Sequence, residues 1–117
     1  MLERILPAMR ARGGYIPTCD HGVPEEGRLD FSFFDEQVDR LGQVGIETIL
    51  CTPTATPPRW LTVKHPEALR VDANGRIMQH GSRQHCCTNS PVFRDYSRKI
   101  TAAMAAHYAD SFSIVGW

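Results

Sequence analysis

The chain has 117 residues, and its 13 lysines and arginines balance 13 aspartates and glutamates. This length allows at most one small domain or a part of a larger one, and the balanced charge favours neither nucleic acid nor an anionic membrane as a partner. No apolar run approaches the roughly 20 residues of a membrane-spanning helix. The N-terminus lacks the continuous apolar segment of a secretory signal, which favours a cytoplasmic location.

The first 28 residues show no regular pattern. The stretch "ARGGYIPTCDHGVPEEGR" is rich in turn-forming residues and has no clear period, so no element is predicted there. From residue 31 onward, apolar residues recur every three or four positions, which predicts one face of a helix: Phe31, Phe34, Val38, Leu41 and Val44. Ser32 and Asp35 form a candidate N-terminal cap pair. Gly45 is placed to end the helix in a left-handed conformation.

The next segment predicts a strand followed by a stiff loop. Residues 46–51, "IETILC", are mostly apolar and β-branched, which suits a strand buried on both faces. Residues 52–58 contain three threonines and three prolines and no glycine, and Trp60 follows. Prolines restrict the backbone, so this loop loses little conformational entropy when a ligand binds. We expect the threonine hydroxyls to face a ligand and Trp60 to anchor the loop by burial.

A long segment between Trp60 and Asn89, here called the excursion, separates this strand from the next helix. Asn74-Gly75 lies between short apolar stretches and predicts a two-residue hairpin. Ser90 is predicted to cap a helix with Pro91 at its first position. The predicted buried face of that helix comprises Phe93, Tyr96, Ile100, Ala103 and His107. Residues 112–117 then form another short apolar strand.

The order strand, helix, strand implies that residues 46–51 and 112–117 are parallel neighbours joined by a right-handed crossover. The excursion therefore starts at the carboxyl edge of the sheet. In parallel α/β folds ligands bind at that edge. We expect the stiff loop to belong to a binding site.

The sequence resembles the N-terminal part of the β-galactosidases of glycoside hydrolase family 42. Two pieces carry the resemblance in combination, "TPTATPPRWL" and "HGSRQH" followed by "NSPV", and it extends over residues 25–117. It implies an α/β fold that is part of a (β/α)8 barrel, from about the second helix to the fourth strand. Residues 1–24 do not match and stay unassigned.

The resemblance implies retaining hydrolysis of terminal, non-reducing β-D-galactose residues by an acid/base glutamate and a nucleophilic glutamate. In the family both follow the segment that corresponds to the end of this chain at Trp117, so the chain is expected to hold no catalytic residue. A complete barrel takes around 250 residues. The chain is therefore interpreted as an inactive fragment of the catalytic domain.

Two residues match functional positions of the family. Arg83, in "HGSR", matches a sugar-binding arginine, and its fork of donors suits sugar hydroxyls; a surface salt bridge is the alternative. Cys87 matches a cysteine that joins three others in a structural zinc site of some members. Zinc needs four converging ligands, and this chain offers one, so a small buried hydrophobe is the competing role for Cys87. No cofactor is expected to be required.

Several other residues have two interpretations. His80 and His85 flank Arg83 and either orient the loop or are ordinary loop residues. Trp60 and Trp117 either stack on sugars or pack in the core, which is the commoner role. Cys86 stands where relatives carry an aromatic residue and is interpreted as a packing residue. An acid/base group of Asp20, His21, Glu25 and Glu26 lies outside the family's catalytic motifs and is disfavoured.

Three function classes remain open on the sequence. The first is part of a β-galactosidase, whose partners would be β-galactosides and, in the parent, further copies in a homotrimer. The second is a carbohydrate-binding module without catalysis. The third is a structural or interaction α/β protein. The apolar C-terminal strand favours the first, because a self-sufficient domain would cover such an edge.

Overall fold

A computed structural model describes residues 14–16, 25–81 and 84–117. The elements in chain order are β1 (Gly14–Ile16), α2 (Ser32–Gln43), β2 (Thr48–Leu50), α3 (Arg59–Lys64), the 3-10 helix η1 (Pro66–Ala68), α4 (Pro91–His107) and β3 (Ile114–Gly116). Within the described residues, no helix combines the length and apolar composition needed to cross a membrane.

The three strands form one parallel sheet in the order β1-β2-β3. Thr48 of β2 is aligned with Gly14 on one side and Ile114 on the other. The predicted parallel pairing of residues 46–51 with 112–117, through a helix that begins after Ser90, is confirmed. Strand β1 was not predicted, because three residues within turn-forming sequence are too few to show a period.

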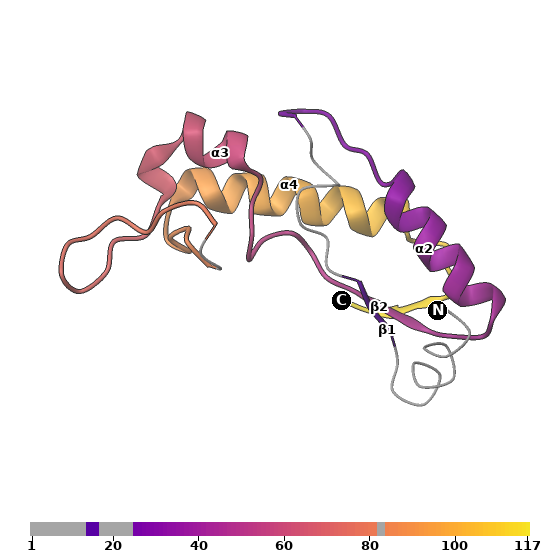
Figure 1. Cartoon of the computed structure of the whole chain (residues 1–117). Coiled ribbons are helices and arrows are strands. Elements are labelled where there is room, and N and C mark those ends of the chain that lie inside the picture. The colour runs from indigo at the N-terminus through magenta and orange to yellow at the C-terminus, as the bar shows by residue number, and fades with distance from the viewer. Residues whose placement is uncertain (1–13, 17–24, 82–83) are drawn as a thin grey trace.

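Both long helices pack on the same face of the sheet (Figure 1). The core between them contains Phe31, Phe34, Val38, Leu50, Met104 and Tyr108, with Ile114 packed against it. Along β2, Thr48 and Leu50 are fully buried, whereas Ile49 is 50% exposed. The prediction that residues 46–51 are buried on both faces is therefore wrong: the helices cover only one side of the strand.

Helix α2 keeps its predicted end but not its predicted start. The Ser32 side chain does not cap the helix; instead, the Asp30 carboxylate accepts hydrogen bonds from the Ser32 backbone N–H at 3.1 Å and hydroxyl at 2.6 Å. At the other end Gly45 has φ 73°. The Ile46 N–H donates to the Leu41 carbonyl and the Gly45 N–H to the Gly42 carbonyl. This pair of bonds is a Schellman motif, which satisfies carbonyls at the helix end.

Helix α4 begins as predicted. The Ser90 hydroxyl accepts a hydrogen bond from the Phe93 N–H at 3.4 Å, and Pro91 occupies the first turn. In the last turns the buried face rotates to Met104 and Tyr108, while His107 is exposed. Because an α-helix has 3.6 residues per turn, the buried face drifts by one position along α4. The prediction that His107 lies on the buried face is therefore wrong. Its Nε2 lies 2.8 Å from the Asp35 carboxylate.

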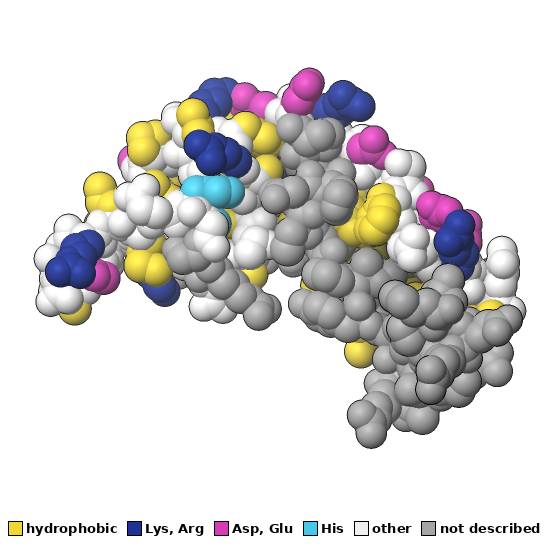
Figure 2. Space-filling model, viewed as in Figure 1, with side chains coloured by type: hydrophobic (Ala, Val, Ile, Leu, Met, Phe, Trp, Pro, Cys, Tyr) yellow, Lys and Arg dark blue, Asp and Glu magenta, His cyan; other side chains and the backbone are white. Residues whose placement is uncertain are grey.

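The excursion forms a second, smaller core against the first half of α4. Leu61, Ala68, Cys86 and Phe93 are buried there, with Trp60 and Tyr96 packed against them. Core packing is thus the role observed for Trp60, whereas Trp117 is 53% exposed. Charged side chains of both signs are interspersed along the convex side of the molecule (Figure 2).

The hairpin of the excursion turns through three residues, not the two that were predicted. Val71 and Ile77 form an antiparallel bridge, and the Asp72 N–H donates to the Arg76 carbonyl. Gly75 has φ 78°, while Asn74 is not in the left-handed region. A two-residue type I′ turn needs both residues left-handed, so one left-handed glycine gives the three-residue form.

Gly42 generates a prediction about the packing of α2 on the sheet. A Cβ atom at this position would lie 2.4 Å from the Ser113 Oγ and 3.3 Å from its Cβ. We expect Gly42→Ala to lower the free energy of unfolding, because overpacking costs about 1–3 kcal/mol and alanine recovers at most about 1 kcal/mol of helix propensity. Urea denaturation followed by circular dichroism measures the change.

Ser113→Gly supplies the matched background for this test. Without the serine side chain, an alanine methyl group at position 42 has room, and Gly42→Ala should then be neutral or stabilising. Equal effects of Gly42→Ala in the two backgrounds would contradict the predicted contact.

Candidate functional site

The stiff loop of residues 52–58 leaves the carboxyl end of β2 and is tied to the end of the excursion. The Gln84 N–H donates to the Ala55 carbonyl at 2.8 Å. Within the loop, the hydroxyls of Thr52 and Thr54 lie 3.2 Å apart. The loop and the segment that follows Arg83 are therefore held together at this edge of the sheet. Arg83 itself, the predicted sugar-binding residue, lies outside the described residues.

Gln84 adopts a left-handed backbone conformation, with φ 59°. Outside glycine this conformation is uncommon and costs roughly 1–2 kcal/mol. Its hydrogen bond to Ala55 offsets part of that cost. Such backbone strain concentrates at ligand-binding and active sites, so the observation is consistent with a functional role for this segment.

The two histidines beside Arg83 have structural partners. Their rings pack edge to face, with centroids 4.9 Å apart. The Thr62 hydroxyl donates to the Arg59 carbonyl at 3.0 Å and lies 3.2 Å from His80 Nδ1. Because the hydroxyl has one proton, His80 Nδ1–H acts as the donor in that contact. His85 is only 1% exposed, and its carbonyl accepts from the Arg70 N–H at 2.8 Å. These contacts favour loop orientation among the two interpretations.

The other side of the stiff loop borders an apolar pocket of about 280 Å³ against α4. Its lining includes the three prolines of the loop and apolar side chains of the helix, namely Pro53, Pro57, Pro58, Phe93 and Ile100. The prolines thus contribute packing surface as well as stiffness. The pocket rim also includes Glu26 and Tyr96, which belong to a polar cluster.

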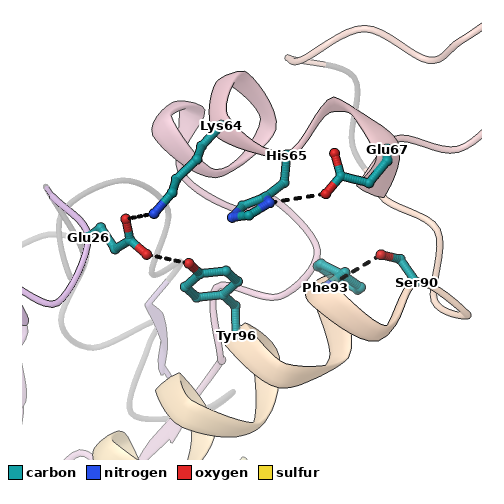
Figure 3. Close-up of polar contacts among 7 residues, drawn as sticks. All are labelled: Glu26, Lys64, His65, Glu67, Ser90, Phe93 and Tyr96. Atoms are coloured by element: carbon teal, nitrogen blue, oxygen red, sulfur yellow. Dashed lines mark hydrogen bonds and ion pairs between the residues drawn. The ribbon is translucent and has the colours of Figure 1, made fainter.

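This polar cluster joins three segments of the chain. Glu26 precedes α2, Lys64 ends α3, and Tyr96 lies on α4 (Figure 3). Lys64 Nζ and the Tyr96 hydroxyl donate to different oxygens of the Glu26 carboxylate. The Tyr96 ring also contacts the rings of Trp60, at 5.4 Å between centroids, and His65, at 5.7 Å. The cluster therefore fastens the excursion to the helix.

The cluster changes the proton affinity of its members. The hydrogen bond from Lys64, followed by that from Tyr96, lowers the pKa of Glu26 below its ordinary value. The same bonds to Glu26 raise the pKa of Lys64 and of Tyr96. Glu26 is thus held as a carboxylate, with both oxygens engaged, which suits a structural carboxylate better than a general acid.

The cysteines do not assemble a metal site in the described part of the chain. Cys87 is partly buried, and its backbone N–H donates to the Ala68 carbonyl at 2.8 Å. Burial, with a smaller effect of Cys87, raises the pKa of the Cys86 thiol to about 11, so Cys86 is not a thiolate at neutral pH. No group of three or more potential ligands converges among the described residues. Cys86 packs in the core as expected.

The remaining acidic candidates do not form a catalytic pair in the described residues. Asp20 and His21 lie outside that part of the chain. Glu25 forms an isolated bridge with Arg28 through the backbone. The Asp72 carboxylate accepts from the N–H groups of Asn74 at 2.8 Å and Arg76 at 2.9 Å, which stabilises the hairpin.

Sequence reasoning missed two features of this region. The Glu26 cluster joins residues up to 70 positions apart, and a single sequence carries no signal for such contacts. The left-handed Gln84 was also missed, because glutamine at that position gives none of the signals that glycine or asparagine would.

Comparison with known proteins identifies the relatives of this chain. The glycoside hydrolase family 42 profile, described as beta-galactosidase, matches residues 20–117. Beta-galactosidase YesZ from Bacillus licheniformis and that from Bacillus subtilis are each 48% identical over 94 residues, which are 80% of this chain and 14% of the relative. A beta-galactosidase of Thermus thermophilus is 42% identical over the same length. The chain thus spans about one-seventh of these curated relatives.

Solved structures agree with this assignment. The cold-adapted beta-galactosidase of Rahnella sp. R3 superposes with a TM-score of 0.87 at 31% identity, covering 99% of this chain and 18% of that one. The beta-galactosidase of Halorubrum lacusprofundi superposes with a TM-score of 0.82 at 38% identity, covering 98% and 18%. The described fold therefore matches a small part of these enzymes.

The polar cluster generates a prediction about pH. Because the folded-state pKa of Glu26 is lowered, its contribution to stability is present above the unfolded carboxyl pKa of about 4.3 and is lost as the pH falls below that value. We expect Glu26→Gln to lower the melting temperature near neutral pH. The difference from wild type should shrink as the medium is acidified through the carboxylate range.

The control is Glu47→Gln, which changes an exposed carboxylate just before β2, at the amino edge of the sheet and away from the loop of residues 52–58. Thermal melts at a series of pH values measure both variants. A Glu26→Gln difference that is constant with pH would show that the carboxylate charge contributes nothing to the cluster.

Proposed function

Because the chain belongs to glycoside hydrolase family 42, we propose that it is part of a retaining β-galactosidase that cleaves terminal, non-reducing β-D-galactose residues. The support is the family match over residues 20–117 together with the superposition on beta-galactosidase structures. The identity of 48% with beta-galactosidase YesZ is well above the level at which only a fold is shared.

The proposed architecture is a segment of a (β/α)8 barrel from about the second helix to the fourth strand. In this arrangement β2 is the third strand and β3 the fourth. Strand β1 takes the place of the second strand, because it is the parallel neighbour of β2 on the side away from β3. The loop after β2 then lies at the carboxyl face, where barrel enzymes carry their active sites.

The observation that carries this proposal is the fixed loop at that face. Residues 52–58 are stiffened by three prolines and bonded through Ala55 to Gln84. The bond adjoins Arg83, which we propose binds hydroxyls of the galactoside. A wall fixed before the sugar arrives reduces the entropy lost on binding.

In this proposal the chain contributes the wall of the pocket and not the reacting groups. A retaining glycosidase places an acid/base and a nucleophilic carboxylate about 5 Å apart. The carboxylates of Glu26 and Asp72 are both engaged in structural bonds. This supports the expectation that the catalytic glutamates lie outside residues 1–117.

The described residues do not form a four-thiolate zinc site by themselves, because Cys87 offers one ligand and Cys86 is buried with a raised thiol pKa. A structural zinc site in the full-length parent, with Cys87 as one of its ligands, stays a prediction. Assembly of the parent as a homotrimer stays a prediction.

A covalent chimera tests the proposed function. The 94 residues of Bacillus subtilis YesZ that match this chain would be replaced by the corresponding residues of this chain. We expect the chimera to hydrolyse a chromogenic β-galactoside and to discriminate against the β-glucoside. A folded chimera without β-galactosidase activity would contradict the proposal.

In that chimera, Arg83→Ala should weaken turnover without changing the melting temperature. Loss of one charged hydrogen-bonding partner costs about 1.5–3 kcal/mol, which corresponds to a decrease in kcat/KM of roughly 10- to 150-fold. Arg76→Ala, on the exposed hairpin, is the matched control and should leave kcat/KM unchanged. A decrease in kcat/KM of less than about twofold, far smaller than the decrease expected from that cost, would show that Arg83 has a structural role.

The isolated chain of 117 residues should not hydrolyse β-galactosides, because the retaining mechanism requires two glutamates that it is proposed to lack. The assay uses chain purified from a host without β-galactosidase, beside a mock purification. Turnover above the mock would place catalytic carboxylates within these residues, among Asp20, Glu25, Glu26 and Asp72.

A further inference from the structure

The hairpin of residues 71–77 carries an asparagine–glycine pair at its tip. The hairpin projects away from the sheet and from α2 (Figure 1). Asn74 and Gly75 are both exposed, and the Asn74 side-chain amide makes no hydrogen bond within the described residues. A Cβ atom at Gly75 would meet nothing within 4 Å. The pair therefore lies on an uncrowded surface that water and hydroxide reach.

An asparagine followed by glycine can modify itself without an enzyme. The Gly75 nitrogen, after losing its proton to hydroxide, forms a bond to the side-chain carbonyl carbon of Asn74. The bond from that carbon to the amide nitrogen breaks, and the nitrogen leaves as ammonia with a proton taken from water. The product is a five-membered succinimide. Glycine permits the attack because it has no Cβ to crowd the nucleophile.

Water then opens the succinimide. It adds to one of the two ring carbonyl carbons, the bond from that carbon to the ring nitrogen breaks, and the nitrogen takes up a proton from the water. Opening at the main-chain carbon routes the peptide through the Asn74 side chain and gives isoaspartate, whereas opening at the side-chain carbon gives aspartate. Either product adds one negative charge to a chain whose formal net charge is zero at pH 7.

The turn holds the attacking nitrogen away from the amide. The Gly75 N–H donates to the Asp72 main-chain carbonyl at 3.1 Å. The Asp72 carboxylate accepts from the N–H groups of Asn74 at 2.8 Å and Arg76 at 2.9 Å. Attack requires the Gly75 nitrogen to leave its bond and turn toward the Asn74 side chain, so the turn must open first. Such an opening is local, because both residues of the flanking bridge are more than half exposed.

We propose that Asn74 is a site of spontaneous deamidation through a succinimide, and that the turn held by Asp72 sets the rate. Water is the co-reactant. The modified hairpin carries a second carboxylate beside that of Asp72, and repulsion between like charges weakens the bonds that the Asp72 carboxylate accepts. The hairpin belongs to neither buried core, so the change is confined to it. The site therefore records the age of the molecule in its charge.

Peptide mapping of the full 117-residue chain tests the site. The chain is incubated at mildly alkaline pH in isotopically labelled water and digested with trypsin, which releases residues 71–76 as one peptide. We expect that peptide to exchange its amide for an acid that contains labelled oxygen, with isoaspartate as the main product.

Asn89, the only other asparagine of the chain, is the internal control. The residue after it, Ser90, is buried and donates its N–H to the Cys87 carbonyl at 3.0 Å. Its side chain also caps α4, so this N–H is held by the start of a helix rather than by an exposed turn. The tryptic peptide that contains Asn89 should therefore stay unmodified.

Variants at position 72 test the control of the rate. Asp72→Ala removes an acceptor that closes the turn and should raise the deamidation rate of the full chain about fivefold, the equivalent of about 1 kcal/mol of lost hydrogen bonding. Asp72→Ser keeps an oxygen that accepts N–H groups more weakly and should give an intermediate rate. In free peptides of residues 70–78, where no turn is held, wild type and both variants should react equally fast.

Two results would overturn the site: a 71–76 peptide that stays unmodified under conditions that convert the free peptide, or aspartate without isoaspartate, which would indicate direct hydrolysis of the side chain. Equal rates for Asp72→Ala and wild type in the full chain would overturn the role of the turn. Asn74→Gln keeps an exposed amide that is one methylene too far for a five-membered ring, so loss of that amide at the wild-type rate would contradict the succinimide route.

Discussion

The structure depends on the burial of one face of a short parallel sheet beneath two helices. Leu50 of β2 is fully buried between Phe34 of α2 and Met104 of α4, both of which are also inaccessible to solvent. Each strand has only three residues, so main-chain bonds alone would not hold the sheet. Helix packing fixes the strands, and the strands in turn fix where the loops begin.

The parallel arrangement determines the position of the excursion. A chain that leaves β2 must return to the amino end of β3, and α4 makes that return. Residues 52–89 therefore lie between the carboxyl end of one strand and the start of its crossover helix. They are fastened at two points, by the bond between Ala55 and Gln84 and by the Glu26 cluster. The stiff loop itself is bonded to Gln84 and borders the pocket against α4.

The features that the sequence could predict are those encoded within a few residues. The 3.6-residue period located both helices, Gly45 and Ser90 marked a helix end and a helix start, and the strand–helix–strand order implied parallel pairing. Two errors had local causes that the apolar period did not show. Asp30 displaced the predicted Ser32 cap, and His107 turned away from the core as the helix phase drifted. The Glu26 cluster had no local signal, and the roles of Arg83 and Cys87 came from family resemblance rather than from physical chemistry.

The hairpin of the excursion has a consequence for sequence variation. Its turn is stabilised from within, by the Asp72 carboxylate and by the left-handed Gly75, and the flanking Val71 and Ile77 are more than half exposed. Little of the core therefore depends on the length of the turn. Loop tips of this kind accept insertions because few buried contacts are disturbed. Relatives that differ in length within the excursion should differ at residues 73–75, and a peptide epitope inserted there would be displayed on the surface without displacing the loop at the sheet edge.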